Sequence, residues 1–366
     1  MNSASPKTAT RNRSYAALVG ALFRQCAAAE LQASGLWLPR GRANVIHDDQ
    51  SARGGFYIDT VLSSHLGTAD QALLRSSRMF GGNPMRRLRT TAGFGHQLAA
   101  GLARICGQND TVRKARQNLA TCFFLFTAIF DSLCDSGEPF ATLVPAVFNL
   151  PLLHLLLDDP ERAGGGLRNS PAWNNDALRI LLKVAIAFFT GLRRIDIADD
   201  DEVKSLIETC YRAEVDTISS GTMGIPAAGG LTDLSAKSRL PFCIIARIVR
   251  EPRDDFAEAA SVAAALGDLV WRVDDMADLA DDLRTGSFNS IAQRAAAETH
   301  SHDVAVMANH MLRPGIAKRE VIALRHDLQI LVDRLTPPRI FVDGGWSFVE
   351  WILAAIRGWL DPVGRR

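Results

Sequence analysis

The chain has 366 residues, 47% of them hydrophobic, so it is long and apolar enough to bury a sizeable core. Its 41 lysines and arginines nearly balance 40 aspartates and glutamates, which gives a formal net charge of +1. This balance excludes a global field that would draw the chain to nucleic acid or to an anionic membrane. The composition predicts a globular protein without a nucleic-acid partner.

The N-terminal segment, residues 1–25, is basic, but its apolar part is only about ten residues long and ends at Arg24, which predicts no signal peptide. The most apolar run, CFFLFTAIF at residues 122–130, is about half as long as a bilayer span. The six cysteines are scattered and form no CxxC pair, as is typical of reduced thiols. We therefore expect a soluble, cytoplasmic protein with no transmembrane segment.

Apolar residues recur at helical spacing and strand-like alternation is scarce, so the sequence predicts an all-α fold. The expected helices cover residues 16–33, 57–79, 91–107, 110–135, 141–157, 174–192, 200–219, 236–250, 253–284, 289–311, 316–335 and 346–360. Turn chemistry separates them, as in ERAGGG from residue 161. No break resembles a flexible linker, so we expect a single-domain bundle of about ten to twelve helices over residues 41–366, with residues 1–40 as an N-terminal arm or first helix.

A strongly apolar predicted helix ends in two carboxylates four residues apart, Asp131 and Asp135. Carboxylates there meet the negative end of the helix dipole, which is unfavourable unless a cation is bound. Phe126 and Thr127 lie about one turn before Asp131, and with Phe130, which directly precedes it, they predict the wall of an apolar cavity below the carboxylates. The alternative is that these side chains are ordinary core residues.

A second acidic set occupies WRVDDMADLADDLRTGSFNS, residues 271–290. Asp274, Asp278 and Asp282 stack along one helix face, with Asp275 beside them, and like charges at this spacing repel. Oxygen ligands of this kind suit Mg²⁺, which proteins usually hold through a few carboxylates and the phosphates of a substrate. One such pair is more often a solvated helix face, but two sets that each adjoin an apolar stretch favour a metal-bridged polyphosphate at an apolar cavity.

These segments resemble the class I isoprenoid synthases, in which two acidic motifs on facing helices of an α-bundle hold Mg²⁺ and the diphosphate of a prenyl substrate. LGDLVWRVDDMADLADD at residues 266–282 is similar to the second aspartate-rich motif of trans-polyprenyl diphosphate synthases. AKSRLPF at 236–242 and PMRRLRT at 84–90 are similar to their lysine-containing and basic segments. The resemblance covers residues 84–290 and implies a helical bundle around a deep apolar cavity.

The resemblance also implies roles for individual residues. The implied metal ligands are Asp131, Asp135, Asp274, Asp275, Asp278 and Asp282. The implied diphosphate ligands are Lys237, Arg284, Arg86, Arg87 and Arg89, although a single basic residue is more often a surface charge.

Two differences from the motifs of chain-elongating isoprenoid synthases bear on the activity that the resemblance implies. The first motif reads DSLCD, without two adjacent aspartates, and SGEPF follows it where chain-elongating enzymes carry an arginine pair. FDSLCDS and DLADDLRTGSFN are similar to the large terpene synthases of the tetraprenyl-beta-curcumene synthase type. This likeness implies a lyase that ionises one prenyl diphosphate with Mg²⁺ and then cyclises or quenches the carbocation. The alternatives are an elongating prenyltransferase that uses isopentenyl diphosphate, and an inactive isoprenoid-binding helical protein, which Ser132 permits.

Three further patterns carry expectations about structure. Gly286 and Asn289 predict the end of the carboxylate helix, and the resemblance places Asn289 near the site. HSHD at residues 300–303 is expected on the surface of a helix, because alternate helical positions point apart. Trp346, Trp351 and Trp359 predict an apolar helix that packs on the bundle or on a partner subunit, which leaves a homodimer open.

Overall fold

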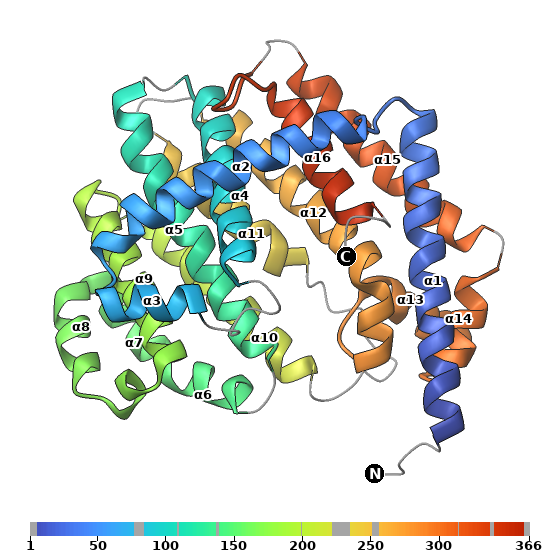
Figure 1. Ribbon diagram of the computed structural model, residues 1–366, viewed down its shortest axis with the longest axis horizontal. Coiled ribbons are helices and arrows are strands. Elements are labelled where there is room, and N and C mark those ends of the chain that lie inside the picture. The colour runs from blue at the N-terminus through green and yellow to red at the C-terminus, as the bar shows by residue number, and fades with distance from the viewer. Residues whose placement is uncertain are drawn as a thin grey trace.

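The computed structural model describes residues 6–76, 84–107, 110–136, 139–198, 200–221, 235–250, 256–313, 315–336 and 340–361. The α-helices are α1 (Pro6–Ala33), α2 (Arg40–Thr60), α3 (Thr68–Ser76), α4 (Pro84–Ile105), α5 (Asp110–Cys134), α6 (Phe140–Val147), α7 (Leu150–Asp158), α8 (Pro160–Arg168), α9 (Asp176–Arg194), α10 (Asp201–Gly221), α11 (Ser235–Val249), α12 (Phe256–Thr285), α13 (Ser290–Thr299), α14 (Val304–Met311), α15 (Ile316–Leu335) and α16 (Phe348–Leu360). Two short 3-10 helices join them, η1 (Leu62–Ser64) and η2 (Pro171–Asn174). The all-α prediction is confirmed over these ranges (Figure 1).

The sixteen described α-helices exceed the expected ten to twelve, because caps divide two segments that were predicted to be continuous and two further helices form where none was predicted. The segment 141–157 is divided into α6 and α7, where the side chain of Asn149 accepts a hydrogen bond from the backbone N–H of Leu152 at 3.0 Å. The segment 289–311 is divided into α13 and α14, where His300 takes a left-handed φ of 49° and Asp303 caps α14. The HSHD segment is therefore a helix break, although both histidines are exposed as expected.

Two helices lie where the sequence predicted none. α2 is polar over most of its length, but its buried Gln50 donates to the carbonyl of Thr90 in α4 at 3.0 Å and accepts from Trp351 Nε1 in α16 at 2.9 Å. α8 forms over a glycine-rich sequence because Asp159 caps its first turn and Pro160 occupies the first helical position. Tertiary and capping contacts thus outweigh intrinsic helix propensity at both places.

Residues 6–33 form a helix packed along one side of the molecule, where α1 runs beside α14 and α15 (Figure 1). Val19, Phe23 and Leu31 are fully buried on its inner face. Arg24 also donates to the carbonyl of Ala277 in α12 at 2.9 Å. α1 is thereby fixed to α12, the helix that carries the second acidic motif.

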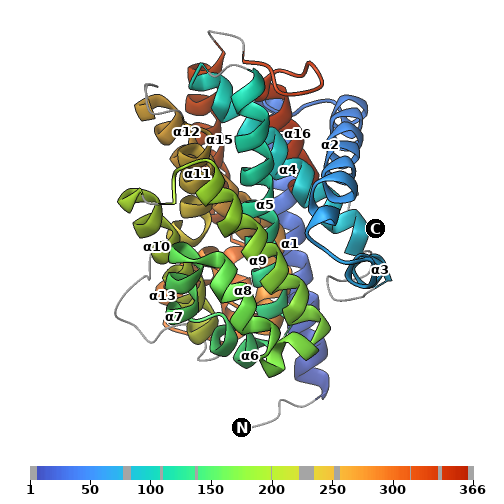
Figure 2. The same ribbon diagram turned by 90° about the vertical axis from the view of Figure 1, so that its left-hand side faces the viewer.

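The described core centres on α5, against which α9 packs while α7 and α8 cover α9 from outside (Figure 2). Phe126 of α5 lies at a ring-centroid distance of 5.2 Å from Phe148 and 6.3 Å from Phe188 of α9. Trp351 of α16 packs against Phe94 of α4 with a ring-centroid distance of 4.8 Å. The tryptophan-containing C-terminal helix therefore packs on the bundle itself.

One described helix segment, Arg113–Cys134, is long and apolar enough to cross a membrane. The bent pair formed by α6 and α7 also passes this test if it is taken as one span. The most apolar stretch of Arg113–Cys134 is 67% buried within the protein, as is usual for a core helix.

Candidate functional site

The first acidic motif lies at the C-terminal end of α5. The backbone N–H of Asp135 donates to the carbonyl of Asp131 at 2.9 Å and closes the last turn. The carboxylate of Asp131 accepts a 2.6 Å hydrogen bond from Lys237 Nζ, at the start of α11. This ammonium is a cation at the negative end of α5, which the sequence predicted should be present. Lys237 and Asp131 are thus brought together from positions 106 residues apart.

Glu214 of α10 completes this cluster and was missed from the sequence. Its carboxylate lies 3.3 Å from Lys237 Nζ, and burial raises its pKa to about 8 although attraction to Lys237 lowers it. Burial also disfavours the charge of Lys237, but attraction to Asp131 and Glu214 holds the pKa of this lysine above its ordinary value. The one sequence pattern that could have indicated its burial is helical spacing, because Glu214 follows the buried residues Val203, Ile207 and Cys210 on the same helix face.

The second acidic motif lies in the last three turns of α12. Burial, and then repulsion from Asp278 and Asp275, raise the pKa of Asp274 to about 8. Burial raises the pKa of Asp282 to about 7, although a 2.9 Å hydrogen bond from Asn289 Nδ2 opposes that shift. Like charges on one helix face therefore repel here, as their spacing predicted.

The end of α12 confirms the expected glycine turn. Gly286 has a φ of 76°, and its backbone N–H donates to the carbonyl of Asp282 at 2.8 Å. Asn289 caps the next helix by accepting from the backbone of Ile291 and Ala292. Its side-chain amide reaches back to Asp282, so one buried residue both caps α13 and contacts the acidic motif.

The two acidic motifs influence each other across the space between α5 and α12. Asp131 is among the charges that raise the pKa of Asp274. Burial, then Asp131 and more weakly Asp278, raise the pKa of Asp135 to about 6. Asp135 and Asp274 are exposed to solvent, yet the surrounding protein partly desolvates both carboxylates. The structure thus brings the motifs into Coulombic range of one another.

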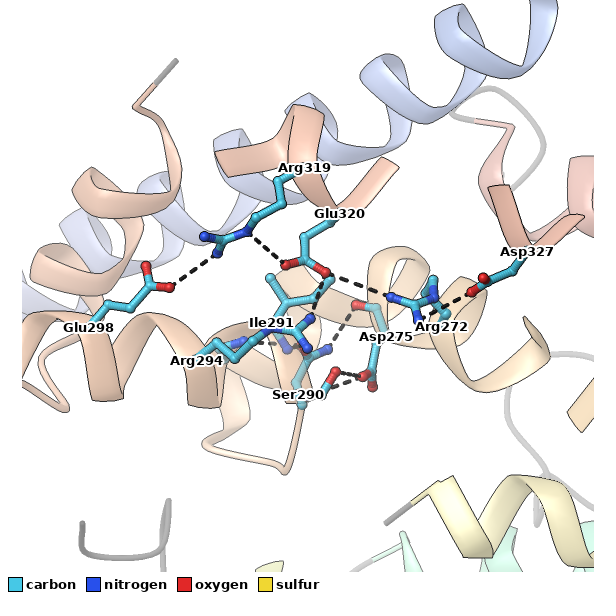
Figure 3. Close-up of polar contacts among 11 residues, drawn as sticks. Arg272, Asp275, Ser290, Ile291, Arg294, Glu298, Arg319, Glu320 and Asp327 are labelled. Atoms are coloured by element: carbon cyan, nitrogen blue, oxygen red, sulfur yellow. Dashed lines mark hydrogen bonds and ion pairs between the residues drawn. The ribbon is translucent and has the colours of Figure 1, made fainter. Parts of the chain in front are cut away.

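Asp275 points to another side of α12, where its carboxylate accepts hydrogen bonds from the backbone and hydroxyl of Ser290 (Figure 3). Beside it, the buried carboxylate of Glu320 lies 2.6 Å from Arg294 and 4.0 Å from Arg272. This ion-pair network joins α12, α13 and α15. Asp275 is therefore placed where it anchors α12 rather than beside Asp131.

The predicted basic ligands are not all brought together. Arg86, Arg87 and Arg89 lie exposed near the start of α4. The charge of Arg87 lowers the pKa of Asp135, which places Arg87 near the first acidic motif. Arg89 instead lies 3.8 Å from Asp59 in α2, and Arg284 pairs with Asp281 on the exposed side of α12 at 2.9 Å.

An apolar pocket lies beside the first motif. The predicted cavity residues Phe126, Thr127 and Phe130 all line it, together with Phe123, Phe148, Leu153, Ile207, Cys210, Tyr211 and Glu214. Because Glu214 also contacts Lys237, the pocket adjoins the charged cluster. Its volume of about 30 Å³ is the space of a single water molecule, so the deep cavity that was expected is not shown.

Among the described residues, the acidic side chains do not form a complete metal site by themselves. Over the described residues, no three histidine, cysteine, aspartate or glutamate side chains converge closely enough to hold an ion by themselves. Any ion bound here would need further oxygen ligands from water or from a bound anion.

The chain matches no protein-family model, and no curated protein matches it significantly. What the site does must therefore be argued from its own residues.

Proposed function

We propose that this protein is a Mg²⁺-dependent terpene synthase that ionises a single prenyl diphosphate. The observation that carries this proposal is that α5 and α12 bring two sets of carboxylates within Coulombic range of one another. Within this arrangement Lys237 is already shared by Asp131 and Glu214. Further positive charge is needed before all the carboxylates can ionise together. The sequence resemblance to class I isoprenoid synthases supports the same interpretation.

The donor set fits Mg²⁺ in its chemistry, because the facing side chains offer carboxylate oxygens. The residues that would hold the ions, directly or through water, are Asp131, Asp135, Asp274, Asp278 and Asp282. Bound Mg²⁺ would supply Lewis-acid neutralisation of the charge that develops on the leaving diphosphate. Since no three of these side chains converge, oxygens of the diphosphate would have to complete the coordination.

Lys237 has the most direct role among the basic residues. Its ammonium contacts Asp131 and Glu214, so it is held at the first acidic motif. If Asp131 turns to an ion, Lys237 can donate to a diphosphate oxygen instead. Arg87, whose charge already acts on Asp135, is the second cation placed to contact the anion.

The aromatic pocket would receive the part of the prenyl chain next to the diphosphate. Phe126 and Phe130 line it, and aromatic ring faces stabilise a nearby carbocation without attacking it. A prenyl chain is far larger than the present volume of about 30 Å³. Substrate binding must therefore rotate these rings or separate α5 from α7 and α10.

The proposal is tested by incubating the purified protein and Mg²⁺ with geranyl, farnesyl, geranylgeranyl and geranylfarnesyl diphosphates, each with and without isopentenyl diphosphate. Extracts are analysed by gas chromatography and mass spectrometry. We expect a hydrocarbon or alcohol from one substrate alone. Asp131→Asn and Asp278→Asn should each lower turnover roughly 100-fold or more, because each removes a charge that supports diphosphate departure.

Asp281→Asn is the matched control, because Asp281 is an exposed residue of the same helix that pairs with Arg284. It should retain turnover, and all variants should keep the helical circular dichroism of the parent. Longer diphosphates formed only with isopentenyl diphosphate would identify an elongating prenyltransferase instead. Tight diphosphate binding without turnover of any substrate would identify an isoprenoid-binding protein.

A further inference from the structure

A second pocket, of about 410 Å³, lies on the opposite side of α9 from the phenylalanines that pack on α5. It is lined by His65, Arg168, Trp173, Lys183, Ile186, Ala187 and Thr190. The last four residues form a continuous stripe along α9, because they follow at three- and four-residue spacing. The volume is within the range of about 300–1,000 Å³ typical of small-molecule sites.

The rim of this pocket is cationic. The buried carboxylate of Asp70 is shared by Lys183 and by Arg179 Nε, the latter at 2.9 Å. Arg179 also pairs with Asp176 at 2.6 Å. The exposed guanidinium of Arg168 makes no hydrogen bond or ion pair with any residue that the structure describes. An anion could therefore bind Arg168 without displacing a partner from the protein.

Arg194, near the end of α9, adds to this charge. Burial, and then the charge of Arg194, lower the pKa of His65 on the pocket wall. Among the residues that line the pocket, Arg168 and Lys183 carry positive charge and none is a carboxylate, so the lining has an excess of two positive charges. This excess matches a phosphate monoester, which carries up to two negative charges at neutral pH.

The wall of the pocket is apolar and includes an aromatic ring. Lys183 Nζ lies 5.6 Å from the ring centroid of Trp173, so the ring and the ammonium are adjacent. Ile186 and Ala187 continue the apolar surface from α9. A ligand here would meet positive charge at the rim and carbon atoms below it.

We propose that this pocket binds an organic phosphate monoester, with its phosphate on Arg168 and Lys183 and its apolar or ring portion against Trp173 and Ile186. Guanidinium favours phosphate because its parallel N–H groups match two oxygens. The pocket is formed by η1, α8, η2 and α9 and contains none of the aspartates proposed to hold Mg²⁺. Its function is therefore independent of the proposed diphosphate chemistry.

Isothermal titration calorimetry of the full chain with phenyl phosphate tests the proposal, with chelator present so that metal-dependent binding at the acidic motifs does not contribute. We expect phenyl phosphate to bind more tightly than inorganic phosphate, and phenol not to bind measurably. Arg168→Gln should weaken phenyl phosphate about tenfold, since it removes a charge-assisted hydrogen bond. Arg162→Gln is the matched control, because Arg162 is an exposed arginine of α8 outside the pocket lining, and it should leave affinity unchanged.

Trp173→Ala tests the contribution of the aromatic ring to binding separately from that of the charged residues. It should weaken phenyl phosphate and leave inorganic phosphate unaffected, with retained secondary structure checked by circular dichroism. The proposal is overturned if phenyl phosphate does not bind, if Arg168→Gln binds it as tightly as the parent, or if inorganic phosphate binds as tightly as phenyl phosphate.

Discussion

Replacing Asp282 with asparagine tests whether the second acidic motif holds uncompensated negative charge. Burial raises the pKa of Asp282 from 3.8 to about 7, the hydrogen bond from Asn289 opposes this rise, and repulsion from Asp278 adds to it. Asparagine has nearly the same shape, and its side-chain oxygen can still accept the hydrogen bond from Asn289 Nδ2. The substitution therefore removes the charge and little else.

The expected change in the free energy of unfolding follows from the linkage between protonation and folding. The folded pKa lies above the unfolded one, so the stability from this group is fully present below pH 3.8 and is lost as the pH rises towards 7. At about 1.4 kcal/mol for each pKa unit, the shift would correspond to about 4 kcal/mol for a fully buried group. Asp282 is only partly buried, and solvent screening reduces this to about 2 kcal/mol.

The assay is urea unfolding followed by circular dichroism from pH 4 to pH 8, with chelator present, for the parent, Asp282→Asn and Asp281→Asn. The free energy of unfolding of Asp282→Asn should rise relative to the parent by about 2 kcal/mol between pH 4 and pH 8. Asp281→Asn should show much less change, because Asp281 is exposed and paired with Arg284. A difference between parent and Asp282→Asn that stays constant over this pH range would refute the reasoning.

Phe126→Ala should lower the free energy of unfolding by about 3–4 kcal/mol in the same urea assay, because it leaves a cavity beside Phe148; a loss below about 1 kcal/mol would contradict the packing described. Asp343→Asn should destabilise the protein more at pH 6 than at pH 2. Hydrogen bonding from His96 holds the pKa of Asp343 well below its ordinary value. The stability that the ionised carboxylate contributes is therefore lost as the pH falls. Equal destabilisation at both pH values would contradict this role. Burial raises the pKa of Cys122 to about 12, so iodoacetamide at pH 8 should modify this thiol only after the protein unfolds. Peptide mass spectrometry would show the modification. Rapid labelling of the native protein would place the thiol at the surface.

The sequence by itself determined the features that depend on neighbours within one or two helical turns. Helical periodicity predicted the all-α class, and four-residue spacing predicted that Asp274, Asp278 and Asp282 share a face and repel. Gly286 ended α12 as expected, because a left-handed residue there closes the last turn. The chemistry assigned to these carboxylates stays a prediction, since spacing alone specifies no substrate.

Tertiary structure decided which charges meet and how deeply they are buried. Lys237 reaches Asp131 across 106 positions in sequence, and the same packing buries Glu214 and turns Asp275 towards Ser290. It also made α2 a helix and left a pocket of about 30 Å³ beside the first acidic motif. Desolvation and Coulombic attraction depend on groups brought together from distant segments, so no local pattern could have specified them.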